Sequence, residues 1–125
     1  MLKTRLLLLA FEKLLYSIAN ERGLVVEKEY RFAIHRGFGY RFDYAIPSIK
    51  VAIEIEGGVY IYGRHNNPIG YTEDVIKYNI ATLEGWRVYR FTTEMLRKGM
   101  VVYPTSKKPN REYILLEDFL RECLR

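Results

Sequence analysis

Apolar residues recur at helical spacing near the start of the chain. Between residues 3 and 20 they are Leu7, Leu8, Phe11, Leu14, Leu15 and Ile18. Positions three and four apart lie on one face of a helix, so this run predicts an amphipathic helix. The segment from Asn20 to Gly23 carries residues that end helices, and the apolar pattern stops there.

Extended segments occupy the middle of the chain. Residues 27–34 are predicted to form a strand, residues 35–39 a glycine-containing turn and residues 40–46 a second strand. Pro47 to Ile49 interrupts the pattern, and residues 50–56 then alternate strictly between apolar side chains and small or acidic ones. The second and third segments therefore predict a hairpin.

The second half of the chain returns to helical spacing. A long loop is predicted over 57–71, followed by a helix over about 73–84 that Thr72 caps and Gly85 ends. A strand is then predicted over 86–91 and a short helix from Thr92 or Thr93 to Lys98. A basic loop over 104–111 and a helix over 112–124 complete the chain's predicted elements. This order is typical of an α/β fold with a central mixed four-stranded sheet flanked by helices. A chain of 125 residues is expected to form one domain, 1–125.

Alternation restricts the register of the hairpin, because a slip of one residue exchanges the buried and exposed faces. The register that pairs apolar residues best places Ile46 opposite Val51, Tyr44 opposite Ile53 and Phe42 opposite Ile55 on one face, and Ala45 opposite Ala52 and Asp43 opposite Glu54 on the other. Arg41 then faces Glu56.

Two carboxylates directly opposite each other, as predicted for Asp43 and Glu54, repel and destabilise a hairpin. A divalent cation between them would remove the repulsion, since hard ions such as Mg²⁺ are held by carboxylates, backbone carbonyls and water. The alternative is a solvated polar face on which Arg41 and Glu56 form a surface ion pair of little energetic value. The hairpin alone leaves both interpretations open.

The charge of the chain favours polyanionic partners without requiring them. The formal net charge is +5 and the isoelectric point is near 9.3. Such a balance suits nucleic acid but also occurs in proteins that never bind it. Charge therefore supports a DNA partner only together with other features.

Cysteine use and the lack of long apolar runs indicate an intracellular protein. The single cysteine, Cys123, cannot form an intramolecular disulfide. The apolar opening resembles the start of a signal peptide, but Glu12 and Lys13 interrupt it without a cleavage site. No apolar run approaches the roughly 20 residues that a membrane helix needs. We expect no membrane contact.

Several ordered motifs resemble a nuclease superfamily. A helix bearing a glutamate is followed by RFDYAIPSIKVAIEIEGG and then by YTEDVIKYNIATLEGWRVYRF. This order resembles the PD-(D/E)XK nucleases, and within them small endonucleases related to the very short patch repair enzymes, including phage-encoded members. The likeness covers about residues 12–96 and leaves the last 25 or so unaccounted for. It implies a restriction-endonuclease-like core and metal-dependent hydrolysis of DNA phosphodiester bonds, in repair or phage DNA processing in the cytoplasm.

The resemblance also implies a ligand set. Asp43 matches the first metal-binding aspartate, Glu54 the second acidic ligand, and Ile55 the residue whose backbone carbonyl completes the set. Glu12 matches a glutamate that some members place near the metal from the first helix. The implied cofactor is Mg²⁺ or Mn²⁺, which would polarise the scissile phosphate and lower the pKa of a bound water.

The sequence departs from the superfamily pattern at Glu56, where a lysine is typical. Glu56 is expected to bind a second ion or to orient the attacking water. Lys77 is a candidate for the missing positive charge, because Asp74 and Lys77 are three residues apart on one helix face. The alternative is that this pair forms an ordinary exposed ion pair on the helix.

Further residues are assigned to DNA contact or chemistry by their place in loops. Arg64 and His65 follow the acidic strand where repair-type relatives carry histidines that assist chemistry, although a lone loop histidine is often only solvated. Arg90 is expected to reach either a phosphate or Glu84. The expected DNA-binding residues are Arg36, Arg41, Arg64 and Arg90, with His35, Tyr60 and Tyr62 along the approach. His65 and Lys77 are assigned to stabilising charge in the reaction.

Other functions compete with this one. A structure-selective nuclease of the junction resolvase type shares the core but usually acts as a dimer, and the sequence leaves monomer and homodimer open. A nucleic-acid-binding module of the same fold without catalysis is the alternative from another class. Three retained acidic residues, Asp43, Glu54 and Glu56, disfavour that module, because carboxylates repel phosphate. A purely structural protein is the least favoured alternative.

Overall fold

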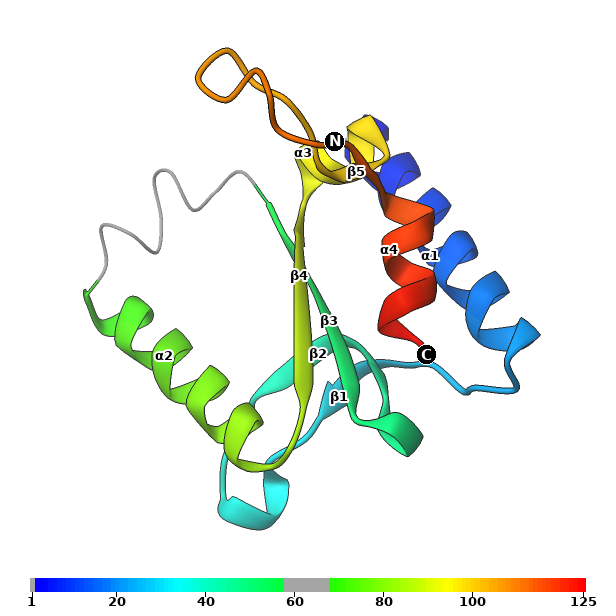
Figure 1. Cartoon of the computed structure of the whole chain (residues 1–125). Coiled ribbons are helices and arrows are strands. Elements are labelled where there is room, and N and C mark those ends of the chain that lie inside the picture. The colour runs from blue at the N-terminus through cyan, green and yellow to red at the C-terminus, as the bar shows by residue number, and fades with distance from the viewer. Residues whose placement is uncertain (1, 58–67) are drawn as a thin grey trace. The chain divides into compact units, whose positions relative to one another are not determined.

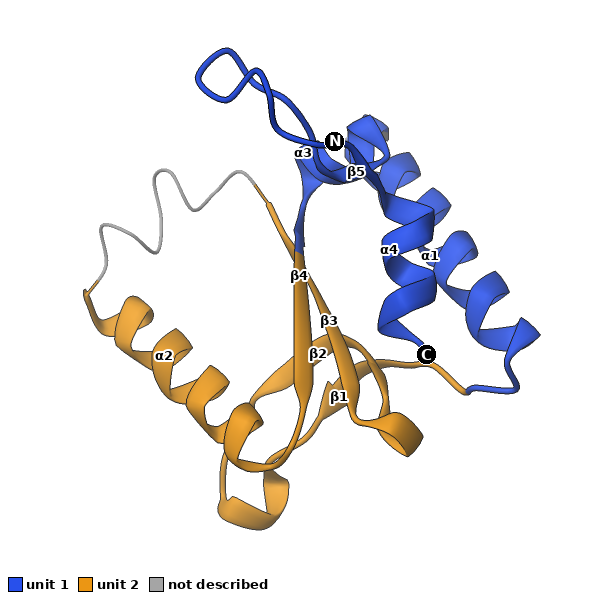
Figure 2. Ribbon diagram, in the orientation of Figure 1, with its two compact units in different colours: residues 1–24, 91–125 blue, residues 25–90 orange. Residues whose placement is uncertain are grey.

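The computed structural model describes residues 2–57 and 68–125 (Figure 1). The chain groups into two compact units, one formed by residues 1–24 and 91–125 and the other by residues 25–90 (Figure 2). A single endonuclease-like domain spanning 1–125 stays a prediction.

A mixed four-stranded sheet forms the larger part of the unit made by residues 25–90. Its strands are β1 (Glu27–Arg31), β2 (Arg41–Ile46), β3 (Val51–Glu56) and β4 (Arg87–Thr92), in the order β1-β2-β3-β4. β2 pairs antiparallel with both β1 and β3, and β4 runs beside β3 in the same direction (Figure 1). The predicted α/β class with a mixed sheet and helices is confirmed.

The β2–β3 hairpin has the predicted register at three residue pairs. Ile46 lies opposite Val51, Ala45 opposite Ala52 and Tyr44 opposite Ile53. A short 3₁₀ helix, η2 (Pro47–Ile49), joins the strands, and Lys50 closes it with a left-handed φ of 52°. Proline at the first position pre-sets the backbone for this turn.

The predicted faces of the hairpin are wrong at Phe42. Alternation predicts Phe42 on the face opposite to Ala45 and Ala52, yet it packs in one buried cluster with them. Its ring stacks on Phe32 at a centroid distance of 4.0 Å. Phe42 also lies 5.8 Å from the Lys77 ammonium of the following helix. Alternation is therefore broken between Phe42 and Ala45.

The helix α2 (Pro68–Leu83) covers one face of this sheet (Figure 1). It begins before the predicted residue 73, because Pro68 suits the first turn of a helix. The expectation that Thr72 caps this helix is wrong, since its hydroxyl donates to the Pro68 carbonyl within the first turn at 2.8 Å. The predicted loop is correspondingly shorter, and its residues 58–67 lie outside the described part of the chain.

Gly85 ends α2 as predicted. Its φ is +85°, a conformation that L side chains rarely adopt. The Trp86 amide donates to the Ala81 carbonyl at 2.9 Å and the Gly85 amide to the Thr82 carbonyl at 3.0 Å. These two bonds form a Schellman motif, which turns the chain from α2 into β4.

The other unit is mainly helical. It contains α1 (Leu2–Glu21), α3 (Thr93–Lys98), α4 (Leu116–Cys123) and a small two-stranded sheet of β5 (Met100–Val102) and β6 (Ile114–Leu115). The first helix and the short third helix agree with the prediction, and the Thr92 hydroxyl caps α3 by accepting from the Met95 amide at 3.1 Å. The small sheet was not predicted, and α4 begins at Leu116 instead of 112 because β6 occupies the two preceding residues.

Buried side chains hold this helical unit together. α1 packs against α3 and α4. The Phe91 ring lies 5.9 Å from Phe11 and 5.8 Å from Phe119, measured between centroids. Within the described residues, the helices are too short or too polar to cross a membrane.

Candidate functional site

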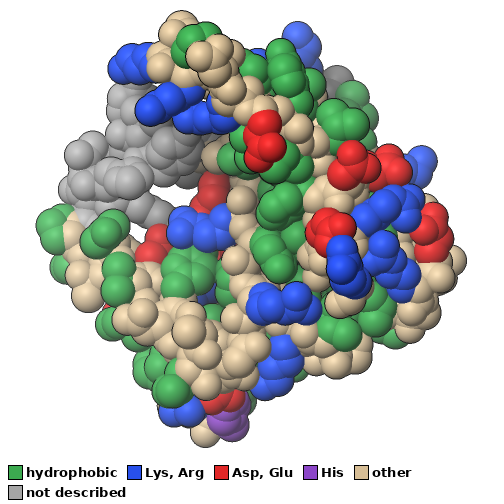
Figure 3. Space-filling view, in the orientation of Figure 1, with side chains coloured by type: hydrophobic (Ala, Val, Ile, Leu, Met, Phe, Trp, Pro, Cys, Tyr) green, Lys and Arg blue, Asp and Glu red, His purple; other side chains and the backbone are tan. Residues whose placement is uncertain are grey.

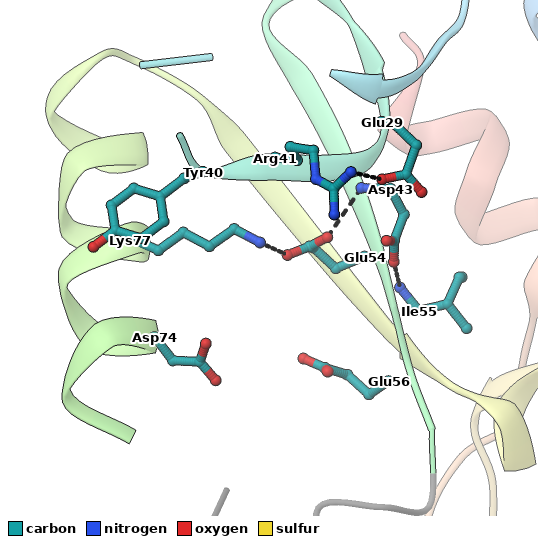
Figure 4. A pocket seen from close by; sticks show the side chains of 9 residues that line it. All are labelled: Glu29, Tyr40, Arg41, Asp43, Glu54, Ile55, Glu56, Asp74 and Lys77. Atoms are coloured by element: carbon teal, nitrogen blue, oxygen red, sulfur yellow. Dashed lines mark hydrogen bonds and ion pairs between the residues drawn. The ribbon is translucent and has the colours of Figure 1, made fainter. Parts of the chain in front are cut away.

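An acidic pocket of about 340 Å³ opens on the α2 side of the sheet (Figure 4). Its lining residues come from β1, β2, β3, α2 and the residue before β2, and they are Glu29, Tyr40, Arg41, Asp43, Glu54, Ile55, Glu56, Asp74 and Lys77. Five of these side chains are acidic and two are basic. The excess of negative charge makes the pocket suited to a cation.

Asp43 and Glu54 are bound to each other's strands. The Asp43 amide donates to Glu54 Oε2 at 3.0 Å, and the Ile55 amide donates to Asp43 Oδ2 at 2.7 Å. Each carboxylate thus accepts from the backbone of the neighbouring strand. This reciprocal pair fixes both carboxylates on a rigid sheet, which is what a preorganised site requires.

Among residues 2–57 and 68–125, Glu54 is the one buried charged residue, with 6 % of the whole residue's surface exposed. A buried carboxylate needs a positive partner and hydrogen bonds. The Lys77 ammonium supplies the charge by forming an ion pair with Glu54 Oε1, and the Tyr78 hydroxyl donates to the same oxygen at 2.9 Å. Figure 4 shows Lys77 extended from α2 toward β3.

This ion pair excludes one of the two interpretations of Lys77, while its role in chemistry stays a prediction. Its side chain is only 15 % exposed. Lys77 therefore does not form the exposed helical ion pair that was the alternative prediction. Asp74 lines the same pocket and faces Glu56 across it (Figure 4).

The charged form of Asp43 is destabilised by its surroundings. Burial raises the pKa of the Asp43 carboxyl, and the carboxylates of Glu54 and Glu29 raise it further. The hydrogen bond from the Ile55 amide and the charge of Lys77 act in the opposite direction without cancelling the rise. A cation in the pocket would stabilise the ionised form.

Glu56 is held from β4. Arg90 Nε donates to Glu56 Oε1 at 2.6 Å, and the Arg90 guanidinium lies 4.6 Å from the Tyr78 ring centroid. Of the two alternatives for Arg90, the pairing with Glu84 is wrong, and contact with a phosphate stays a prediction. Arg41 forms its ion pair with Glu29 at 3.3 Å, and it is Arg90 that neutralises Glu56.

Arg36 lies away from this pocket's lining. It is on η1 (Ile34–Arg36), and its Nε donates to Glu84 Oε2 at 2.7 Å. The His35 ring contacts the other Glu84 oxygen at 2.7 Å. The hydrogen bond from Arg36 lowers the pKa of Glu84, with a further contribution from His35. The structure thus joins the two residues to the C-terminal end of α2.

Three further predicted site residues lie outside the described part of the unit that forms the pocket. Arg64 and His65 lie outside the described residues. Glu12 is half-buried on α1, in the unit made by residues 1–24 and 91–125.

Sequence reasoning missed residues of the site, among them Tyr78 and Glu29. Tyr78 follows Lys77 directly, and neighbouring helix residues point in different directions, so spacing gives no reason to place both on Glu54. Glu29 sits in β1 with a φ of +51°, which no sequence pattern indicated. The place of both residues in the site depends on how the strands and α2 pack together.

The donor set fits a hard divalent cation. In the described ranges, no three His, Cys, Asp or Glu side chains converge as a ready-made metal site. Asp43 and Glu54 nevertheless offer two fixed carboxylates, and Ile55 lines the same pocket. Magnesium sites commonly consist of one or two carboxylates completed by other oxygen atoms and water. Asp43, Glu54 and the Ile55 carbonyl are the residues that would hold the ion.

The chain matches no protein-family model, and neither curated proteins nor solved structures include a significant match to it.

Proposed function

We propose that this chain is a metal-dependent DNA endonuclease with a restriction-endonuclease-like core, similar to the very short patch repair enzymes. The observation that carries the proposal is the pocket in which Asp43 and Glu54 are locked across β2 and β3 while Lys77 reaches Glu54 from α2. Metal-dependent hydrolysis of a phosphodiester uses ligands for the ion, which neighbouring carboxylates provide, and a positive charge that stabilises the transition state.

Mg²⁺ or Mn²⁺ bound by Asp43, Glu54 and the Ile55 carbonyl would supply Lewis-acid polarisation of the phosphate and a water of lowered pKa. The protein's own contribution is rigidity. The reciprocal hydrogen bonds of Asp43 and Glu54 keep both carboxylates in place, so little reorganisation is needed when a phosphate arrives.

Lys77 takes the role of the lysine that the superfamily pattern expects at position 56. Its ammonium is shielded from water and sits at the pocket that the phosphate would enter. In such a site a positive charge stabilises the negative charge that develops on the phosphate oxygens. Lys77 of α2 and the residue at position 56 of β3 both line this pocket.

Glu56 is proposed to orient the attacking water or to hold a second ion. Its carboxylate lines the pocket, and Arg90 binds it from β4. This ion pair limits the rotation of the Glu56 side chain. Arg90 is thereby assigned to positioning Glu56, beside its predicted role in DNA contact.

The experiment compares the native protein with Asp43→Asn on supercoiled plasmid and on mismatched or branched oligonucleotides, with Mg²⁺, Mn²⁺ or EDTA. We expect metal-dependent cleavage that Asp43→Asn lowers more than about 100-fold, since even residues behind metal ligands cost about 10- to 100-fold. Glu27→Gln is the matched control, because Glu27 is an exposed acidic residue of β1 outside the pocket. It should cleave like the native protein.

A second candidate is a nucleic-acid-binding module without catalysis. It is favoured by Glu54, whose carboxylate already accepts from Lys77, Tyr78 and the Asp43 amide. DNA binding by the native protein with equal background cleavage from native and Asp43→Asn protein would establish this candidate. Preferential cleavage of branched DNA would instead identify the junction resolvase type.

A further inference from the structure

The loop between β5 and β6 carries a concentration of positive charge. Its residues, 103–113, include three basic ones, Lys107, Lys108 and Arg111, and one acidic one, Glu112. In Figure 3, Lys and Arg side chains gather at this loop, which projects from the helical unit. Residues 105–111 are all exposed.

The tip of this loop has a defined backbone. The Thr105 amide donates to the Lys108 carbonyl and the Lys108 amide to the Thr105 carbonyl, both at 3.1 Å. The Thr105 hydroxyl also accepts from the Lys108 amide at 3.1 Å. Pro104 and Pro109 bracket the turn and restrict its backbone. The turn therefore presents its lysines from a preorganised position, which reduces the entropy lost on binding.

The three basic side chains of this loop form no ion pair with a described carboxylate. Within the described residues, Lys107, Lys108 and Arg111 have no carboxylate within 4.0 Å, the limit for an ion pair. Other cations of the same unit are paired, for example Arg121 with Glu21 at 2.8 Å. The uncompensated charge is thus available to an external polyanion.

We propose that Lys107, Lys108 and Arg111, here called the basic turn, bind the phosphate backbone of duplex DNA independently of the acidic pocket. The inference rests on the proposed function for its choice of DNA. A duplex is favoured over a single strand because it carries about one charge per 1.7 Å of length, twice that of one strand. Contacts of this kind add affinity without sequence preference and release counterions.

The test measures binding of a fluorescent 30-base-pair duplex by anisotropy in EDTA between 50 and 200 mM NaCl. The triple variant Lys107→Gln, Lys108→Gln and Arg111→Gln should bind about tenfold more weakly at 100 mM salt, and the slope of log K against log salt should fall by about 2 to 3. The variant without the Arg111 change should show an intermediate slope.

A matched control removes three exposed charges from the same unit. Lys3→Gln, Arg5→Gln and Lys13→Gln change the net charge equally, and all three positions are exposed on α1. This control should keep the native salt slope. An unchanged slope in the basic-turn variant, or an equal loss in the control, would overturn the inference. So would basic-turn-dependent binding that is tighter for a single strand than for the duplex.

The two proposals fail separately. Binding in EDTA does not depend on cleavage, so turn-dependent binding by a protein that never cleaves DNA supports the basic turn and removes the endonuclease. Metal-dependent cleavage, together with a salt slope that the basic-turn substitutions leave unchanged, would support the endonuclease and overturn the basic turn.

Discussion

At the scale of single residues, the ion pair between Lys77 and Glu54 is the feature of the pocket with the largest energetic consequence. Both side chains are shielded from water, with 15 % and 8 % of their surfaces exposed. Removing one partner of such a pair leaves an uncompensated buried charge. The pair therefore contributes to stability as well as to the proposed chemistry.

Lys77→Met should lower the free energy of unfolding at pH 7 by about 3 kcal/mol, as for other broken buried pairs. Tyr78 and the Asp43 amide still bind Glu54, so the protein should remain folded. Urea denaturation measures the loss. Adding Glu54→Gln should recover part of it, because the remaining partner is then uncharged; a double variant that loses the full sum of both single changes would contradict the coupling.

Asp43 makes the stability of the fold decrease with rising pH. Its pKa is raised in the folded protein mainly by burial, so the folded state binds a proton more readily than the unfolded state. The free energy of unfolding should fall as pH rises from the usual aspartate range through the raised pKa. Above the raised pKa, the destabilisation caused by the buried Asp43 carboxylate is fully present. Below the usual aspartate range it is absent.

Asp43→Asn removes this cost and keeps an oxygen that can accept from the Ile55 amide. We expect the variant to be more stable than the native protein at neutral pH, with the difference vanishing as pH falls below the usual aspartate range. Urea unfolding between pH 3.5 and 7.5 measures this, with Glu27→Gln as control. A difference that grows on acidification would contradict the assigned cause.

At the scale of elements, the end of α2 sets the direction of β4. Gly85 has a φ of +85° and the two Schellman hydrogen bonds depend on it. A Cβ at this position would lie 4.0 Å from Lys50 Cδ, an ordinary contact. The cost of a side chain here is therefore conformational and not steric.

Gly85→Ala should lower the free energy of unfolding by about 1 to 2 kcal/mol, the cost of a left-handed conformation for a residue with a Cβ. Gly39→Ala is the matched control, because Gly39 has no positive φ and a Cβ added there would meet nothing within 4 Å. Thermal unfolding compares the two. Equal stability of both variants would show that the left-handed turn does not hold α2 in place.

At the scale of the whole molecule, a cation bound to the acidic pocket should stabilise the fold. A ligand that binds only the folded state adds about 1.4 kcal/mol at a tenfold excess over its Kd. Mn²⁺ or Mg²⁺ should therefore raise the Tm of the native protein, and EDTA should reverse the rise. Asp43→Asn should show a much smaller shift, whereas an equal shift would place the ion elsewhere.

Sequence alone predicted much of this architecture. Helical spacing located α1, Gly85 located the end of α2, and alternation gave the register of Ile46 with Val51. These features follow from local rules, because the spacing of apolar residues and the turn residues are written in consecutive positions. The pairing of Asp43 with Glu54 followed from that register.

Tertiary structure decided how the site is completed. Alternation predicted the wrong face for Phe42, which packs with Ala45, Ala52 and Trp86 in the cluster that the sheet forms with α2. The partners of Glu54, Glu56 and Arg41 lie on other elements, and a charged side chain selects its partner by proximity in space. The sequence by itself thus determined which residues form the strands and bring the two carboxylates together. Only the packing of α2 and β4 against those strands determined that Lys77 pairs with Glu54 and Arg90 with Glu56, since these pairs depend on distances between segments far apart in the chain.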